Sequence, residues 1–455
     1  MKRTRVVALE ILLEADAEDR FVDEILALRR NELDVRDRRL LQEIVFGVVR
    51  HRNTLDHILS AHVRAGMASQ RPPVREALRM GAYQLVYLYK IPAHAAVDET
   101  VEALKPAEGA TRREIGFVNA VLHQLARDIV GKSRGAPQKE GDGLDVLPIR
   151  GGFARFARPV LPDAAKLEAH LSIAYSMPEW LVRRWLARLG EEETRELLRA
   201  MLDVPPVTAR VTRWAPSREE LATSLAEDGL RIEPGPRPDA IVVRGGDLSQ
   251  ARALALGWIQ VQDVTAMEIG DILKPPVGAR VLDLCAAPGS KALQLIERIG
   301  ETGHLVATDR SDEKLVLVRR TLERVATNFS TARLPESPEE IDLGETFGHV
   351  LVDVPCSNTG VLARRPDARW RLRRRDLESL ALIQGKLLEA AWRHLAPGGR
   401  LLYSTCSIEP EENEERIAEF IAAHPEATEL TVRQFLPHRA AGDGGYASLL
   451  LKPRS

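Results

Sequence analysis

The chain of 455 residues has few cysteines, no excess charge of either sign and no long apolar run. It has three cysteines, Cys285, Cys356 and Cys406. So small and uneven a number argues against a disulfide framework and is typical of a protein in the reducing cytoplasm. Lys and Arg total 64 against 66 Asp and Glu, so the net charge is −2. The overall charge therefore does not itself indicate a nucleic-acid partner, and evidence for one must come from local patches of positive charge. We expect no membrane span, because no run approaches about 20 apolar residues. We also expect no metal site, because Cys and His do not cluster at ligand spacing.

The chain does have an ordinary globular composition, 44% apolar and 29% charged, and enough length for several domains. Residues 1–130 carry apolar side chains at helical spacing and predict an all-α domain. Residues 131–163 are dominated by Gly, Pro and charge and predict a linker. Residues 164–260 mix helices with short strands and predict a small α+β middle module.

Residues 261–455 alternate strands with helices, which favours a doubly wound, Rossmann-like α/β domain. The expected strands are 279–285, 304–309, 349–354, 399–406 and 448–453.

The segment VLDLCAAPGSK, residues 281–291, predicts a ligand-binding turn. A buried strand leads into small residues and then a helix, so backbone N–H groups can approach a ligand closely. The spacing is neither G-x-G-x-x-G nor a P-loop, and a plain strand–helix connector is the alternative. Asp309 ends the next strand 20 residues after Gly289 and can bind a ribose diol or merely cap a turn. The candidate cofactor-binding residues are Cys285, Ala286, Ala287, Pro288, Gly289, Ser290, Lys291 and Asp309.

Two cysteines lie where strands are expected to end. Cys356 follows the strand that delivers Asp353, and Cys406 closes the strand 399–406. Ligands of doubly wound sheets lie outside the carboxyl ends of the strands, so two thiols there favour a reactive role over an inert one. An adenosine-like ligand, a strand-end acid and a thiol suit methylation of a pyrimidine at C5, in which a thiolate first adds to C6. The residues alone leave open which thiol is the nucleophile.

An arginine-rich segment follows Cys356. Seven arginines and Trp370 lie between Leu362 and Asp376. Positive charge with an interleaved aromatic is typical of RNA contact, and a solvated basic helix is the alternative. The candidate RNA-binding residues are Arg364, Arg365, Arg369, Trp370 and Arg371.

The segments DLCAAPGSK (283–291), DVPCSNTG (353–360) and STCSIEPEEN (404–413) resemble motifs I, IV and VI of RNA cytosine-C5 methyltransferases. They are most similar to the Sun/Fmu (RsmB-like) family, which acts on 16S ribosomal RNA. RRLLQEIVFGVVR (38–50) resembles part of the NusB-like RNA-binding domain that this family carries at its N-terminus.

The resemblance implies an S-adenosyl-L-methionine-dependent enzyme that forms 5-methylcytosine in 16S ribosomal RNA through a covalent cysteine–C6 adduct. Cys406 would be the nucleophile, and Cys356 would assist elimination of the product. Asp353 would contact the base and also take part in cofactor binding near the methyl donor, while residues 285–291 and Asp309 would hold the rest of the cofactor. We expect a monomer, because no coiled-coil heptads are visible.

One position departs from the resemblance. The segment STARLPES (330–337) has Thr331 or Ala332 where the family has an acid near the adenine. This departure supports a second hypothesis, a noncatalytic RNA-binding assembly or transcription factor with a degenerate methyltransferase fold, although both cysteines argue against it. A methyltransferase for small molecules or proteins is disfavoured by the NusB-like segment and by the arginines.

Overall fold

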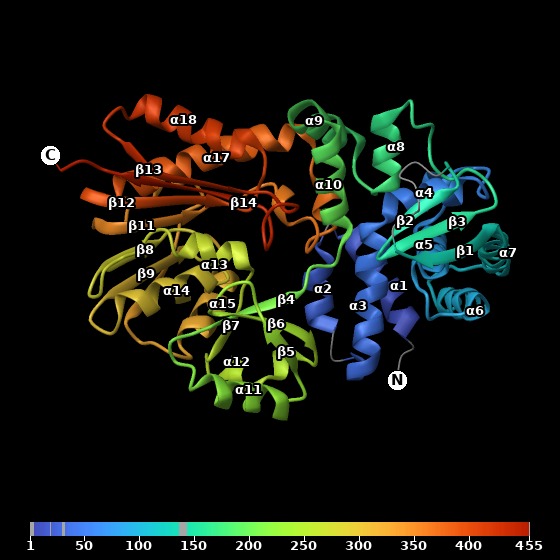
Figure 1. Cartoon of the computed structure of the whole chain (residues 1–455), viewed down its shortest axis with the longest axis horizontal. Helices are drawn as coiled ribbons and strands as arrows, with labels where there is room; N and C mark the ends of the chain where they lie inside the picture. The colour runs from blue at the N-terminus through green and yellow to red at the C-terminus, as the bar shows by residue number, and fades with distance from the viewer. Residues whose placement is uncertain (1–3, 19, 30–31, 136–142, 455) are drawn as a thin grey trace. The chain divides into compact units, whose positions relative to one another are not determined.

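A computed structural model describes residues 4–18, 20–29, 32–135 and 143–454 (Figure 1). The chain divides into two compact units, each considered by itself. They are Met1–Asp203 with Arg365–Arg371, and Val204–Arg364 with Leu372–Ser455. Within the described ranges, no helix combines the length and the apolar content that crossing a bilayer requires.

The first unit begins with a helical domain centred on α5, Pro72–Tyr87. Every α5 residue from Glu76 onward is buried, because α1, α3, α4, α6 and α7 pack around it. The close crossing with α7 depends on Gly81, where a Cβ atom would lie 2.3 Å from Cδ1 of Leu122. The predicted all-α domain is confirmed. Its other helices are α1 (Thr4–Ala17), α2 (Val22–Arg29), α3 (Val35–Arg50), α4 (Arg52–Ser60), α6 (Ala93–Leu104) and α7 (Arg112–Asp128).

The segment 131–163, predicted to be a linker, instead takes part in a small antiparallel sheet. Its strands pair in the order β1–β3–β2. Leu147, Ala154 and Phe156 are buried, but the glycines, prolines and charges around them hide this pattern in the sequence. Residues 136–142 of the predicted linker lie outside the described residues. The strands are β1 (Ile129–Arg134), β2 (Val146–Ile149) and β3 (Gly152–Phe156).

Three further helices belong to the first unit and not to the middle module predicted over 164–260. They are amphipathic, and Trp185 and Leu197 are among the side chains that they bury. The second unit therefore begins at Val204. The helices are α8 (Leu167–Ala174), α9 (Glu179–Leu189) and α10 (Glu191–Leu202).

The middle module of the second unit is a four-stranded antiparallel sheet in the order β5–β6–β4–β7. Leu221 and Leu225 of α11 pack on Ile241 and Ile259 of the sheet. The predicted α+β character of the module is confirmed. Its elements are β4 (Val207–Val211), α11 (Arg218–Glu227), β5 (Arg231–Pro234), β6 (Ala240–Gly245), α12 (Arg252–Ala255) and β7 (Ile259–Val261).

The rest of the second unit is built on a seven-stranded sheet in the order β10–β9–β8–β11–β12–β14–β13. The strands from β10 to β12 are parallel, whereas β14 and β13 pair antiparallel at one edge. The predicted Rossmann-like domain is confirmed, with a mixed rather than a purely parallel sheet. The strands are β8 (Arg280–Asp283), β9 (His304–Asp309), β10 (Phe329–Arg333), β11 (Phe347–Asp353), β12 (Leu395–Thr405), β13 (Thr428–Phe435) and β14 (Gly445–Leu451).

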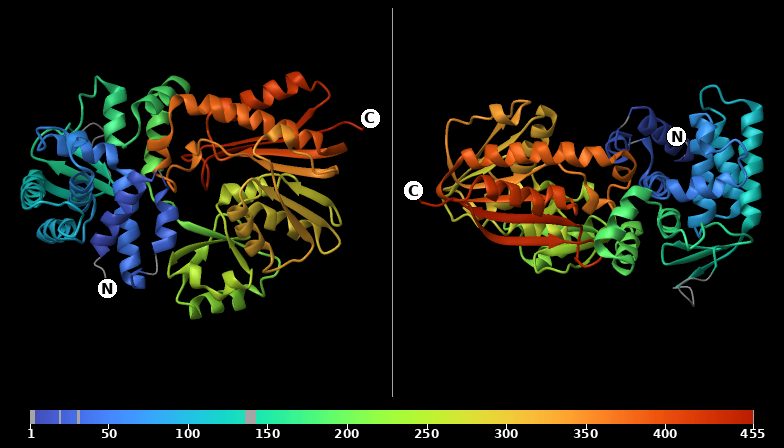
Figure 2. Two further views of the ribbon diagram at one scale, coloured as in Figure 1. Left: turned by 180° about the vertical axis from the view of Figure 1, so that it is seen from behind. Right: turned by 90° about the horizontal axis from the view of Figure 1, so that it is seen from above.

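Helices cover both faces of this sheet (Figures 1 and 2). Along β11, Val350 and Val352 pack in the core beneath α17 and α18, whereas Leu351 packs in the core beneath α13, α14 and α15. Burial on both faces explains why the central strands are nearly continuous apolar runs. The helices are α13 (Val264–Gly270), α14 (Ser290–Ile299), α15 (Asp312–Leu322), α17 (Arg374–Arg393) and α18 (Glu414–Ala423).

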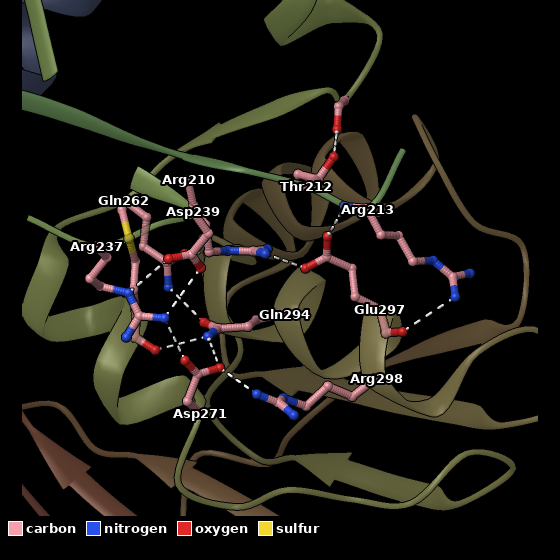
Figure 3. Close-up of polar contacts among 12 residues, drawn as sticks. Arg210, Thr212, Arg213, Arg237, Asp239, Gln262, Asp271, Gln294, Glu297 and Arg298 are labelled. Carbon is pink, nitrogen blue, oxygen red and sulfur yellow. Dashed lines mark hydrogen bonds and ion pairs between the residues drawn. The ribbon is translucent and has the colours of Figure 1, made fainter. Parts of the chain in front are cut away.

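Ion pairs join the middle module to α13 and α14 (Figure 3). Arg210 of β4 pairs with Glu297 of α14. Arg237 pairs with Asp239 at 2.9 Å and with Asp271 at 2.6 Å. These side chains line a hollow of about 490 Å³. Each acid there is paired with an arginine. These ion pairs stabilise the packing of the middle module against the Rossmann-like domain of the same unit.

Candidate active site

The carboxyl ends of four neighbouring strands bring the predicted site residues to one edge of the sheet. The strand β8 leads into the turn 285–291, and β9 ends at Asp309. The strand β11 ends at Asp353, and β12 ends at Thr405, directly before Cys406. Because these strands run parallel, their ends share one edge, which is where a ligand binds in this class of fold.

The turn after β8 has the geometry of a close backbone approach. Gly289 precedes α14 with φ of 105°, a left-handed conformation that favours glycine. Its N–H donates to the carbonyl of Ala286 at 2.7 Å, and the N–H of Ala286 donates to the carbonyl of Thr308 at 2.8 Å. The turn is therefore tied to β9, and it leads into the N-terminus of α14, which favours a negatively charged group.

Asp283, which is buried, and Cys285, which is half-buried at the start of this turn, both have raised pKa values. Burial, followed by the negative charge of Asp353, raises the pKa of Asp283 to about 8. Burial, together with the charges of Asp283 and Asp309, also raises the pKa of the Cys285 thiol. At neutral pH Cys285 is thus a thiol, which is a poor nucleophile.

The second strand end fits the predicted ribose contact, but the third strand lacks an acid. Asp309 is half-buried, and its Oδ1 accepts a hydrogen bond from the N–H of Ser311 at 3.2 Å. On β10, Thr331 lies in register with Ala307, and its Oγ1 accepts a hydrogen bond from Nη1 of Arg319 at 2.9 Å. An arginine therefore contacts the position where the family resemblance leads one to expect a carboxylate.

Asp353 connects three of the strand ends. Its Oδ2 accepts a hydrogen bond from Nζ of Lys291 at 2.6 Å, which links β11 to the turn after β8. Its Oδ1 accepts a hydrogen bond from Oγ of Ser404 at 2.7 Å, which links β11 to β12. The predicted base-contacting acid is thus held between the candidate cofactor turn and the segment that carries Cys406.

The sulfur atoms of Cys356 and Cys406 lie 3.0 Å apart, although 50 residues separate them in the sequence. Both cysteines are free thiols and both are half-buried. Sγ of Cys406 also donates to Oδ1 of Asn358 at 3.2 Å. Asn358 has φ of 61°, a left-handed conformation that turns the chain after Cys356 back towards Cys406. Two thiols that meet at the ligand-binding edge can act in turn on one substrate atom and its neighbour.

Sequence reasoning missed the polar residues that support this thiol pair. Ser404, Asn358 and Glu412 all lie inside the segments DVPCSNTG and STCSIEPEEN, but each resembles an ordinary strand, turn or helix-start residue. Their roles depend on contacts between segments about 50 residues apart, which no local pattern reveals.

Two residues of the arginine segment contact backbone carbonyls inside the first unit. Arg369 is fully buried, and it donates to the carbonyls of Ser176 and Met201 at 3.0 and 3.2 Å. Nε1 of Trp370 donates to the carbonyl of Val49 at 2.7 Å. All of these residues belong to the first unit. The prediction that Arg369 contacts RNA is therefore wrong, because its guanidinium is used to join internal backbone segments.

The other predicted RNA-binding arginines are also held by internal partners. Arg364 pairs with Asp263 and Asp443 at 2.7 and 2.6 Å in the second unit. In the first unit, the guanidiniums of Arg365 and Arg371 lie 5.3 and 4.5 Å from the ring centre of Phe21. The exposed arginines of this stretch come afterwards, and they are Arg373, Arg374 and Arg375.

Comparisons with known proteins cover the whole chain. The model described as "16S rRNA methyltransferase RsmB/F" matches residues 271–451. The models of the NusB family and of the RsmF/B-like ferredoxin-like domain match residues 2–127 and 177–247. The ribosomal RNA small subunit methyltransferase B of Klebsiella pneumoniae subsp. pneumoniae is 33% identical over 463 residues, covering 99% of this chain and 98% of the relative. Its counterpart from Yersinia pseudotuberculosis serotype O:1b is 30% identical over 466 residues, covering 99% of this chain and 100% of the relative. Among solved structures, the crystal structure of PH0851 shares the fold with a TM-score of 0.78 at 23% identity, covering 99% of both chains.

Proposed function

Because the chain belongs to the ribosomal RNA small subunit methyltransferase B family, we propose that it transfers a methyl group from S-adenosyl-L-methionine to C5 of a cytosine in 16S ribosomal RNA. The observation that carries this proposal is the 3.0 Å contact between the sulfur atoms of Cys356 and Cys406. A methyl transfer to a pyrimidine C5 needs an addition step and an elimination step, and two adjacent thiols suit that sequence.

The residues of the turn 285–291 and Asp309 fit S-adenosyl-L-methionine. The N-terminus of α14 favours a carboxylate such as that of the methionine part, and the half-exposed carboxylate of Asp309 can accept hydrogen bonds from ribose hydroxyls. When bound, this ligand supplies an electrophilic methyl group. Asp353, held by Lys291 and Ser404, would lie between this site and the target base.

In the proposed reaction, the thiolate of Cys406 adds to C6 of the cytosine, and the electron pair of the 5,6 double bond moves to C5. C5 then takes the methyl group, whose bond to the sulfonium sulfur breaks, so that S-adenosyl-L-homocysteine leaves. H5 leaves as a proton to water, the bond from C6 to the sulfur of Cys406 breaks with its electron pair returning to the sulfur, and the 5,6 double bond is restored. Cys356 assists this elimination, and Asp353 contacts the base during both steps.

The test is transfer of label from tritiated S-adenosyl-L-methionine to 16S ribosomal RNA, followed by nucleoside analysis. We expect label in 5-methylcytosine with the wild-type protein. Label in another nucleoside would contradict the cytosine-C5 assignment.

A second candidate function is that of a noncatalytic RNA-binding assembly factor, and the contact of Arg319 with Thr331 at the missing-acid position favours it. Calorimetry separates the two functions before any RNA is added. The methyltransferase requires that S-adenosyl-L-methionine bind, whereas the assembly factor would bind RNA with no measurable affinity for the cofactor and with no methyl transfer.

A further inference from the structure

A buried carboxylate that the proposed reaction does not use lies directly behind the thiol pair. Glu412 ends the short turn η6, Pro410–Glu412, and its side chain is fully buried. Its Oε1 accepts hydrogen bonds from the N–H of Ser357 and from Nε2 of Gln384, each at 2.8 Å. Its Oε2 accepts hydrogen bonds from Oγ of Ser407 at 2.5 Å and from Oγ of Ser357. A backbone N–H and an amide NH₂ can only donate, so Oε1 is an acceptor in both of its contacts. Burial raises the pKa of Glu412, and the hydrogen bonds from Ser357, Ser407 and Gln384 oppose that rise.

The donors to Glu412 lie next to each reactive cysteine. Ser357 directly follows Cys356, and Ser407 directly follows Cys406. One carboxylate therefore holds the turn after β11 against the turn after β12. The hydroxyl of Tyr403 donates to the backbone carbonyl of Glu412 at 2.6 Å, which fixes the turn η6 on β12. No disulfide joins the two sulfur atoms. Their separation is set by their own contact, by Asn358 and by this clamp between the two turns.

The charges around the thiol pair are unequal on its two sides. The contact with Cys406, burial and the negative charge of Glu412 together hold the pKa of Cys356 well above its ordinary value. On the other side, burial alone would lower the pKa of Lys291, but the charge and hydrogen bond of Asp353 and the charge of Cys406 raise it. The charge of Cys406 thus favours the protonated form of Lys291, whereas the charge of Glu412 opposes ionisation of Cys356. Tyr403 also faces Glu412 and Cys356, and its own pKa is raised first by burial and then by their charges.

We propose that Glu412 is a positioning residue for both cysteines: its side chain clamps their two turns together, and its charge disfavours loss of the proton from Cys356. The inference rests on the proposed function, in which Cys406 and not Cys356 is the nucleophile. Loss of the proton from Cys356, however, can be measured without RNA or cofactor.

The experiment is alkylation of the whole protein with iodoacetamide between pH 6 and 10, with mass spectrometry of the peptides that contain each cysteine. In the wild-type protein we expect Cys406 to react faster than Cys356. Glu412→Gln keeps a similar shape and can still accept from the Ser357 N–H, but it removes the charge. We expect it to shift the midpoint for Cys356 downward by about one pH unit or more, which is the size of a neighbouring-charge effect. Glu415→Gln, at an exposed acid on the adjacent helix α18, is the matched control and should leave both midpoints unchanged.

Methyl transfer separates the clamp from the charge. We expect Glu412→Ala to lower kcat more than Glu412→Gln, by about tenfold or more because a misplaced reacting atom is costly, with an unchanged KM for S-adenosyl-L-methionine. Equal alkylation midpoints in wild type and Glu412→Gln, or faster alkylation of Cys356 than of Cys406 in the wild type, would overturn the inference. If the wild-type protein methylates no RNA, the proposed function fails, while the alkylation result still decides the role of Glu412.

Discussion

Two regions that the sequence marks as functional use their side chains in opposite ways. At the carboxyl ends of the strands, Lys291, Asp353, Cys356 and Cys406 come together at an accessible edge. In the segment 364–371, charged and aromatic side chains turn inward and hold backbone segments together. The order of parallel strands in the sheet brings the strand-end residues together. Whether an arginine is exposed depends instead on whether the fold places backbone carbonyls or carboxylates within reach of its guanidinium. A cluster of positive charge is therefore weaker evidence of function than two reactive groups at the ends of neighbouring strands.

The largest expected effect comes from the strand-end region. Cys406→Ala removes the proposed nucleophile, and we expect methyl transfer to 16S ribosomal RNA to fall by at least about 10³-fold, as for other covalent catalysts. The melting temperature should stay close to that of the wild type, because the side chain is half-buried and small. If Cys406→Ala kept more than a tenth of the wild-type rate of methyl transfer, Cys406 would not be the nucleophile, and the strand-end region would lose its proposed catalytic role.

The opposite result is expected for the arginine segment: a substitution there should lower the free energy of unfolding, because these side chains hold backbone segments together and do not take part in methyl transfer. Arg369→Met leaves the buried carbonyls of Ser176 and Met201 without their donors. We expect the free energy of unfolding to fall by about 2–4 kcal/mol, since each unsatisfied buried group costs about 1–3 kcal/mol. Urea unfolding measures the loss. Arg375→Met, at an exposed arginine of the same stretch, is the matched control and should change stability by about 0.5 kcal/mol or less.

The free energy of unfolding should depend on pH through Asp283, at the end of strand β8. The pKa of Asp283 is raised to about 8 in the folded state. The folded protein therefore retains a proton that the unfolded chain releases, and the stabilising effect of that proton is lost as pH rises from the unfolded pKa towards 8. Asp283→Asn cannot release a proton, so its stability relative to wild type should increase between pH 5 and pH 8, by more than about 1.4 kcal/mol, the equivalent of one pKa unit. Urea midpoints at the two pH values measure this, and a constant difference would show that Asp283 is ionised throughout.

The smallest effect should come from the exposed arginines that follow the buried ones. Replacing Arg373, Arg374 and Arg375 together with Ala should weaken RNA binding and reduce the slope of log affinity against log salt by up to about 2, because exposed cations release counterions from phosphates. Filter binding at several salt concentrations gives the slope, and thermal unfolding should be unaffected. An unchanged slope would mean that Arg373, Arg374 and Arg375 do not contact RNA phosphates.

The difference between the two regions also shows which features of the structure can be predicted from the sequence. The strands 304–309 and 349–354 are apolar runs between turn residues, so their existence and their ends could be predicted, and with them the meeting of Asp353, Cys356 and Cys406. The short strand β10 and the exposed edge strand β13 lack such runs and could not. The burial of Arg369 could not be predicted either, because its acceptors are 193 and 168 residues away in the chain.

Glu412 shows the same limit inside the site. In the sequence it is one of several acids at a helix start, where negative charge is common for reasons of the helix dipole. Only the fold shows that this acid faces inward to Ser357 and Ser407, whereas Glu414 and Glu415 are exposed.

The most direct test of the account uses the elimination step. Cys356→Ala, incubated with S-adenosyl-L-methionine and 16S ribosomal RNA, should accumulate a protein–RNA adduct that survives denaturation, and mass spectrometry should find the nucleotide on Cys406. The account predicts no adduct with Cys406→Ala. An adduct carried by Cys356 in the Cys406→Ala protein, or no adduct with either variant while the wild type methylates the RNA, would contradict the proposed division of roles between the two thiols.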